Sequence, residues 1–458
     1  MSKITKGLLS IASILSLAAC SNTTGEAEEL VQDDNPDKGL ETFGETIQYD
    51  PNKLVNEGEP ISIEYWTWGE TDPINKLAES YEEIYPNVDI EVSIQPWDDF
   101  WTKLPLSLKG EDGPALFNIH NSQHDNIFPY LAPYDIPVED LQADFESVDS
   151  HVIDGEVYYT DYLINSGNIY YNKTLWEEAG LSEDDIPQTW DEFTEVAKQL
   201  TKYDEDGNII QAGYNFNGDI SAIYEGLNYQ KEELLFNEDG TANFDNSTTK
   251  ENFEYLTNLY EKEKVGSKDF GDDSSMSFGN AQTAMVYKWG WFLGELNNNY
   301  SDIDFGVFAT PTPTEEVPFA YDRYNGESTP GVNKNQSEEQ QAVAQDFLKY
   351  ILAGEEYSVE GALSLASFPS KKSLVDNPDV LENPVLKALS PRVDRLIWPG
   401  PFPATVETTA TQVMEDILYN GKDIDQALSD GQEQMDKDME NAEFNSLQSS
   451  YKFFDELN

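Results

Sequence analysis

The chain has 458 residues, with 88 Asp or Glu against 27 Lys or Arg, and a formal net charge of −61 at pH 7. This excludes nucleic acid as a partner, because binding it requires Lys and Arg to neutralise phosphates. The charge also repels anionic membrane surfaces and discourages self-association, which predicts a monomer. The 38% of hydrophobic residues still predict a globular protein of two or three domains. We interpret the acidity as adaptation to a saline or alkaline exterior; exclusion of anionic ligands and capture of cations are the alternatives.

The first twenty residues have the pattern of an export signal. Two lysines precede an apolar run at residues 7–17, which is shorter than the roughly 20 residues that span a bilayer. The motif LAAC at 17–20 resembles a bacterial lipobox, in which diacylglycerol is attached to the cysteine. The resemblance implies that residues 1–19 are a signal peptide and that Cys20 is acylated, anchoring the protein to the outer face of the cell membrane. A secretory signal cut at an A-x-A-like site is the alternative.

The segment that follows is predicted to be an acidic, flexible tether over residues 20–58. It carries ten acidic residues and two lysines, with little apolar periodicity, so like charges keep it extended. Apolar residues then alternate from Ile61, follow helical spacing between Ile74 and Tyr85, and alternate again from Val88 to Ile94. A strand, a helix and a strand in this order predict parallel pairing and an α/β domain.

Helix starts and turns are predicted further along the chain. Residues 174–177 and 189–192 both have the sequence of a capping box, and Gly180 is placed to end the first of these helices. The Asp-Gly pairs at 206–207 and 239–240 predict turns between short strands.

Several segments together resemble the extracellular sugar-binding lipoproteins of ABC importers, the family that includes maltose-binding protein. Each segment alone is weak evidence of this resemblance, but their order along the chain matches the family from residue 61 onward. The segments are DGEVY at 154–158, NIYYNKTLWEEAGL at 168–181, PQTWDEF at 187–193, FGNAQTAMVYKWGW at 278–291, DFG at 304–306 with Pro311 and Pro313 behind it, and LYNGKDIDQALSDG at 418–431.

The resemblance implies a two-lobed periplasmic-binding-protein-like (Venus-flytrap) α/β fold with a hinge of crossing strands. We predict a first lobe of residues 59–164 and 302–366, and a second lobe of residues 165–301 and 367–458. The implied function is non-catalytic: the lobes close over a sugar, which we expect to be an oligosaccharide, and deliver it to a membrane permease. No cofactor is implied.

Candidate sugar-contacting residues combine flat rings with polar side chains, because a pyranose has apolar faces and a polar rim. Several follow strands, where open α/β sheets bind ligands. Trp291 and Trp68 match family positions best, and Asp161 stands where the family usually has a Gly-Leu-Pro-like step. For most of the tryptophans, packing is the competing explanation. The candidates are Trp66, Trp68, Trp97, Asn118, His120, Asp161, Tyr287, Trp289, Trp291, Arg323, Tyr324, Trp398 and Phe402.

The sequence gives weaker support for other classes of function. The chain has no G-x-S-x-G, P-loop, H-E-x-x-H or paired C-x-x-C motif, and a glycosidase carboxylate pair is not identifiable among so many acids. A zinc receptor could use His120, His124 and His151. A polyamine receptor would need acids beside the tryptophans, as at residues 66–70. Neither Asp-Gly turn completes a calcium loop.

Overall fold

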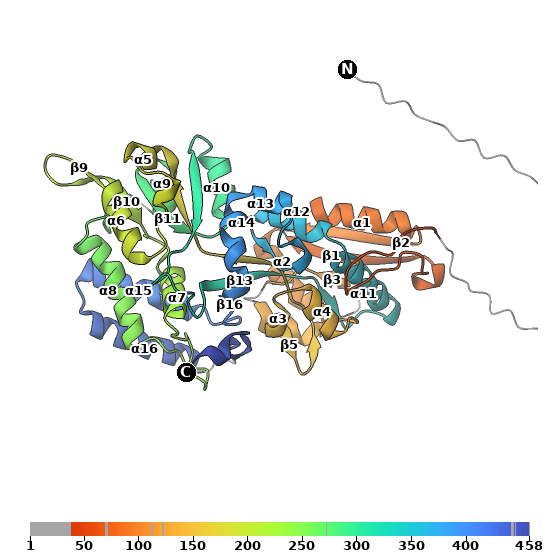
Figure 1. Ribbon diagram of the computed structural model, residues 1–458. Coiled ribbons are helices and arrows are strands. Elements are labelled where there is room, and N and C mark those ends of the chain that lie inside the picture. The colour runs from red at the N-terminus through yellow and green to blue at the C-terminus, as the bar shows by residue number, and fades with distance from the viewer. Residues whose placement is uncertain are drawn as a thin grey trace, which may run out of the picture.

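A computed structural model describes residues 38–457 except 69–71, 111–112, 121–122, 272, 441–443 and 445. The predicted signal peptide and Cys20 lie outside these residues. Figure 1 shows two α/β halves joined through a central group of strands and helices. The two-lobed fold predicted from the sequence is therefore confirmed. Within the described part of the chain, no helix is both long and apolar enough to cross a membrane.

The first lobe is built on a sheet of order β2-β1-β3-β14-β4. β1 and β2 are parallel, with Ile61 opposite Val88, and α1 connects them, so the predicted strand, helix and strand are confirmed. The elements are β1 (Ile61–Trp68), α1 (Asp72–Ile84), β2 (Val88–Gln95), α2 (Trp97–Ser107), β3 (Leu116–Phe117), α3 (His124–Ile127), β4 (Leu131–Ala132), α4 (Val138–Asp144), β5 (Val152–Ile153), β6 (Glu156–Val157), β14 (Gly331–Asn333) and α11 (Glu338–Ala353).

The second lobe is built on a sheet of order β12-β8-β11-β10-β9, in which β10 and β11 are parallel. Its elements are β8 (Asn168–Asn172), α5 (Lys173–Glu178), α6 (Trp190–Leu200), β9 (Lys202–Tyr203), β10 (Ile209–Asn215), α7 (Ile220–Gln230), α8 (Ser247–Glu261), α9 (Ser274–Gly279), β11 (Thr283–Lys288), α10 (Phe292–Asn299), β12 (Phe305–Ala309), α15 (Thr405–Asn420) and α16 (Ile424–Met439).

A third sheet, of order β15-β7-β13-β16, lies between the two lobes. β7 leads directly into β8 of the second lobe, and β13 runs antiparallel to it, with Tyr324 opposite Ser166. These two strands are the predicted crossing strands of the hinge. The elements here are β7 (Asp161–Ser166), β13 (Asp322–Ser328), α12 (Glu356–Leu365), β15 (Phe368–Pro369), α13 (Pro378–Glu382), α14 (Pro384–Leu389) and β16 (Leu396–Ile397).

Each lobe has its own hydrophobic core. The first core includes Tyr65, Phe117 and Phe347, and the second includes Phe193 and Met285; all five side chains are fully buried. Burying a side chain of this size contributes about 1.5 to 3 kcal/mol. Because the two cores are separate, the lobes can move relative to each other without either core being opened.

The structure confirms some of the predicted helix starts and turns and contradicts one. Thr189 and Glu192 form the predicted capping box of α6. The box predicted at residues 174–177 is wrong, because α5 begins two residues earlier than that box requires and Asn172 caps it by accepting from the Leu175 amide. The turn at 206–207 joins the antiparallel strands β9 and β10, as predicted.

The predicted flexible tether of residues 20–58 is wrong for its second part. Residues 38–58 fold against the first lobe, where Ile47, Tyr49 and Val55 are buried in the core. The Tyr49 hydroxyl donates to Asp346 of α11 at 2.6 Å. The apolar residues of this segment follow no regular spacing, although the burial of three of them is enough to hold the chain.

The predicted lobe division also needs one correction. Residues 302–366 were assigned to the first lobe, but β12 pairs along its whole length with β8 of the second-lobe sheet. The chain therefore leaves the second lobe only after β12, and returns toward the first lobe along β13.

Candidate functional site

The carboxyl ends of β1, β2 and β3 bring an aromatic cluster to one edge of the first-lobe sheet. All three strands are parallel, so their ends share an edge, which is where open α/β sheets bind ligands. The Trp68 ring lies 5.1 Å from Trp97, 5.4 Å from Trp101 and 6.5 Å from His120. The structure thus places together Trp68, Trp97 and His120, which the sequence analysis proposed separately. We call Trp68, Trp97, Trp101 and His120 the aromatic edge.

The aromatic edge is partly open to solvent and electrically neutral. Trp97 is 42% exposed. Burial lowers the pKa of His120, with Asp161 opposing the shift, so the ring is mainly uncharged at pH 7. Asn118 is held beside it, because its amide donates to Thr67 at 2.7 Å. Such a surface suits the apolar face and hydroxyl groups of a neutral ring.

Further polar groups lie near the aromatic edge of the first lobe. The Nε1 of Trp66 donates to Glu64 at 2.7 Å, which leaves its ring half-buried at the strand end. Among the described residues, the buried Oε1 of Gln95 and Nε1 of Trp101 have no hydrogen-bond partner. Buried polar atoms are normally paired. One unpaired acceptor therefore lies at the end of β2 and one unpaired donor in α2. Neither residue was among the sequence-based candidates.

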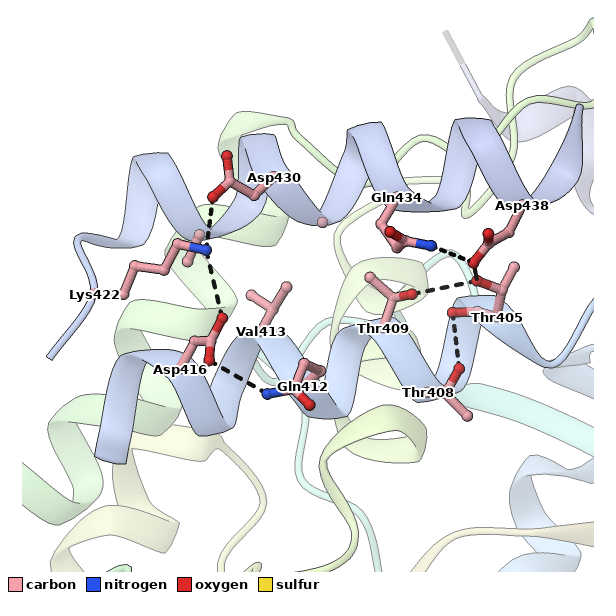
Figure 2. Close-up of a pocket in the computed structure, with 12 residues that line it drawn as sticks. Thr405, Thr408, Thr409, Gln412, Val413, Asp416, Lys422, Asp430, Gln434 and Asp438 are labelled. Carbon is pink, nitrogen blue, oxygen red and sulfur yellow. Dashed lines mark hydrogen bonds and ion pairs between the residues drawn. The ribbon is translucent and has the colours of Figure 1, made fainter. Parts of the chain in front are cut away.

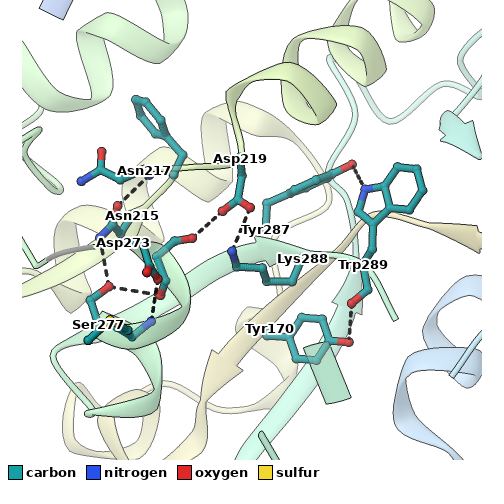
Figure 3. A network of polar contacts seen from close by, with 12 residues as sticks. Tyr170, Asn215, Asn217, Asp219, Asp273, Ser277, Tyr287, Lys288 and Trp289 are labelled. Carbon is teal, nitrogen blue, oxygen red and sulfur yellow. Dashed lines mark hydrogen bonds and ion pairs between the residues drawn. The ribbon is translucent and has the colours of Figure 1, made fainter. Parts of the chain in front are cut away.

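The second lobe presents a polar network at the ends of its parallel strands β10 and β11. Lys288, the last residue of β11, forms an ion pair with Asp219 at 2.8 Å (Figure 3). Ser274 donates to the same carboxylate at 2.5 Å. Burial raises the pKa of Asp219, and Lys288 opposes that shift. We call Asp219, Ser274 and Lys288 the polar network. The sequence analysis missed all three, although Lys288 stands inside the KWGW motif.

Two tryptophans extend from this network. Trp291 is 50% exposed at the start of α10, with the Lys288 ammonium 5.7 Å from its ring. Trp289 is half-buried, and its Nε1 donates to the Tyr287 hydroxyl at 3.0 Å, as Figure 3 shows. Tyr287 is itself buried and donates to Asp322 at 3.0 Å. Trp291 is thus free to meet a ligand, whereas Tyr287 supports Trp289 from below.

Arg323 lies beneath this surface. It forms ion pairs with Glu225 and Glu407, and its guanidinium lies 4.8 Å from the Trp289 ring and 5.5 Å from the Phe402 ring. Burial raises the pKa of Glu225 to about 8, and Arg323 opposes that shift. The guanidinium of Arg323 is therefore already engaged by Glu225 and Glu407, and its visible role is to hold two aromatic rings in place.

The other candidates lie inside the protein. Asp161 is fully buried and accepts from Ser328, with His151 Nε2 3.0 Å away. The buried Trp398 ring stacks on His151 at 4.5 Å and faces Tyr324 at 6.4 Å. These contacts explain Asp161, Tyr324 and Trp398 by packing at the hinge, although the charge of Asp161 still acts on His120 of the aromatic edge.

The crossing strands form the floor between the two edges. Asn165 of β7 accepts a hydrogen bond from the backbone N–H of Gly290 at 2.9 Å, which fixes the loop that carries both Trp289 and Trp291. No sequence pattern marked Asn165, because its role depends on a partner 125 residues away.

The three histidines do not form a metal site in the described part of the chain, where no group of three or more metal-ligating side chains occurs. His124 Nδ1 lies 2.6 Å from the Tyr159 hydroxyl, and His151 pairs with Asp161. His120 belongs to the aromatic edge.

A separate groove of about 310 Å³ lies between α15 and α16 (Figure 2). Its walls carry threonine, glutamine and aspartate side chains, and Lys422 bridges Asp416 and Asp430 at 3.4 and 2.7 Å. No aromatic side chain lines it. A sugar ring would find no flat surface there, so the edges between the lobes remain the better candidate site.

Two lobes with facing strand ends, joined by crossing strands, define a two-lobed binding protein. The sequence model described as bacterial extracellular solute-binding protein matches residues 76–388, and the chain belongs to this family. The arabinooligosaccharide-binding protein of Halalkalibacterium halodurans is 25% identical over 69% of this chain and 72% of its own length. The diacetylchitobiose-binding protein DasA of Streptomyces coelicolor is 26% identical over 70% and 75%.

Solved structures show the same fold. The cyclic alpha-maltosyl-1,6-maltose binding protein of Arthrobacter globiformis aligns with a TM-score of 0.68 at 20% identity, covering 84% of this chain and all of its own. A cyclo/maltodextrin-binding protein complexed with maltotetraose aligns with a TM-score of 0.70 at 16% identity, covering 84% of this chain and 99% of its own.

Proposed function

We propose that the protein is a lipid-anchored receptor that captures an oligosaccharide between its lobes and delivers it to the permease of an ABC importer. The observation that carries the proposal is the pairing of two unlike surfaces: an exposed aromatic edge on one lobe and Trp291 with the polar network on the other. Family membership and relatives named for arabinooligosaccharide and diacetylchitobiose support a glycan of at least two units.

Capture works by a shift of population between open and closed forms. A ligand that contacts Trp97 on one lobe and Trp291 on the other makes both contacts only when the lobes are closed, so its binding energy favours closure. Asn165 keeps the Trp291 loop at the hinge, next to the axis of movement. The closed form is then the form that the permease receives.

The ligand-contacting set that we propose is smaller than the set expected from sequence. It contains Trp66, Trp68, Trp97, Asn118 and His120 on the first lobe, and Trp289, Trp291 and Phe402 on the second. The buried Asp161, Tyr287, Arg323, Tyr324 and Trp398 support these residues or the hinge.

A thermal-shift screen tests the receptor function. The full chain is titrated in saline buffer with arabino-, chito- and malto-oligosaccharides, their monosaccharides, spermidine and zinc. A ligand that binds only the folded state must raise the melting temperature, by an amount that grows with the logarithm of ligand concentration over Kd. We expect a shift with one oligosaccharide series. A shift with zinc or spermidine alone would replace the sugar proposal.

Lipid anchoring has its own test. Cys20→Ala is expected to abolish labelling by radioactive fatty acid and to release the protein into the medium, because one lost anchor removes two acyl chains and their membrane affinity. Unchanged retention on the membrane would reject acylation at this cysteine.

A further inference from the structure

The last residues of the chain are held on the second lobe and also contact the first lobe. Within 446–457 the chain packs on the second-lobe core: Tyr451 is buried and donates to the Phe319 carbonyl at 2.9 Å, and Gln448 Oε1 accepts from Tyr229 at 2.9 Å. Arg395 holds Glu456 with two hydrogen bonds of 2.8 and 2.9 Å. This segment is therefore a fixed part of the second lobe.

The same segment makes two polar contacts with the first lobe. Ser450 donates to the hydroxyl of Ser150 at 3.0 Å, and the Lys452 ammonium lies 3.5 Å from Glu146. Glu146 and Ser150 flank the turn that follows α4, in the first lobe. All four residues line a small cavity, to which the hinge contributes Ile164 and Tyr324. We call the two contacts the back latch.

The back latch lies on the opposite face of the crossing strands from the ligand edges. Ile164 and Tyr324 line the cavity of the latch, whereas the next residue, Asn165, binds the Trp291 loop through Gly290. Consecutive side chains of a strand point to opposite faces. Rotation about β7 and β13 that brings the ligand edges together must therefore separate Glu146 and Ser150 from the carboxyl-terminal segment.

Both latch contacts are formed in the conformation described here. Among the described residues, no ring contact joins Trp68 or Trp97 to Trp289 or Trp291. We propose that the back latch stabilises the open form of the receptor and so sets how much ligand binding energy is needed for closure. This inference rests on the lobe closure of the proposed function, but it concerns the protein without ligand.

Distance measurements between spin labels test the latch without any ligand. Labels at Thr102 of α2 and Asn298 of α10, both exposed, report the separation of the lobes on the ligand side. They are introduced as cysteines in the full chain carrying Cys20→Ser, since Cys20 is the only cysteine. Pulsed electron resonance then gives the distance distribution for each latch variant.

The variant Ser450→Ala with Lys452→Glu removes both contacts and places two carboxylates together, while Tyr451 and Gln448 remain to hold the segment. We expect part of the population to move to shorter distances. Any bound glycan should gain roughly two- to fivefold in affinity, on the scale of an exposed ion pair. Adding Glu146→Lys to this variant should move the distribution back.

Lys231→Ala is the matched control, because Lys231 pairs with Glu251 at the same 3.5 Å but within one lobe. It should leave the distribution unchanged. If the double variant melts early, Lys452→Gln alone provides the milder test. Distances that are identical in wild type and latch variants, or that grow longer, would overturn the inference. Failure of every glycan to bind would instead reject the proposed function and leave this measurement valid.

Discussion

The two ligand edges differ in how their side chains are held. On the first lobe, Trp68, Trp97 and His120 support one another by ring contacts, and no charge is needed. On the second lobe, Lys288 and Asp219 form a buried ion pair below Trp291. Apolar packing tolerates small changes, whereas a buried charge that loses its partner is costly. The first edge therefore offers contact area, and the second fixes where the ligand lies.

The largest effect expected from this difference is on stability. Lys288→Ala leaves Asp219 buried without its partner and should lower the free energy of unfolding by about 3 kcal/mol. Urea denaturation followed by circular dichroism measures the loss. Lys103→Ala, which breaks the exposed pair with Asp99, is the control and should leave the midpoint nearly unchanged. Equal losses in the two variants would show that the polar network is not the rigid part of the site.

The next effect is on affinity. Trp291→Ala should weaken binding of the glycan found in the thermal screen by about 1 to 3 kcal/mol, as for other central aromatic contacts. Its melting temperature should change little, because the ring is 50% exposed. Tyr419→Ala removes a similarly exposed ring on α15 and should leave the Kd, measured by calorimetry, at the wild-type value. A large fall in stability without loss of affinity would return Trp291 to a packing role.

The smallest expected effect is a difference between the two edges in how stability depends on pH. Burial lowers the pKa of His120, so its contribution to stability is present above pH 6.5 and is lost as pH falls through the lowered value. Burial raises the pKa of Asp219, so its contribution is present below pH 3.8 and is lost as pH rises.

Unfolding free energies from pH 3 to 8 should show both trends in matched variants. His120→Gln should flatten the rise of stability with pH near 6, and Asp219→Asn should remove a decline at more acid pH. If these substitutions leave the slopes unchanged, neither His120 nor Asp219 is as shielded from water as its burial indicates.

Sequence reasoning predicted the fold correctly, and it named the exposed tryptophans that we propose as ligand contacts. The strand, helix and strand from Ile61 onward follow from periodicity, and Trp291 was recognised because it stands in a short motif. Asp161 and Trp398 were candidates for ligand contact, and the structure buries both against His151. An acid or a ring near the end of a strand has the same sequence pattern whether it faces a ligand or such a partner.

The contacts that the sequence could not predict join residues that are far apart in the chain. Asp219 and Lys288 are 69 residues apart, and Asn165 and Gly290 are 125 apart. The acidic charge of residues 38–58 predicts a tether, yet three of their irregularly spaced apolar side chains lie in the first-lobe core.

Hydrogen–deuterium exchange of the full chain, with and without the glycan that shifts its melting temperature, tests the central claim most directly. The account predicts protection of backbone amides on both edges, at residues 95–101 and 288–292, when the glycan is bound. Protection of one lobe alone, or of the groove between α15 and α16, would contradict capture between the lobes.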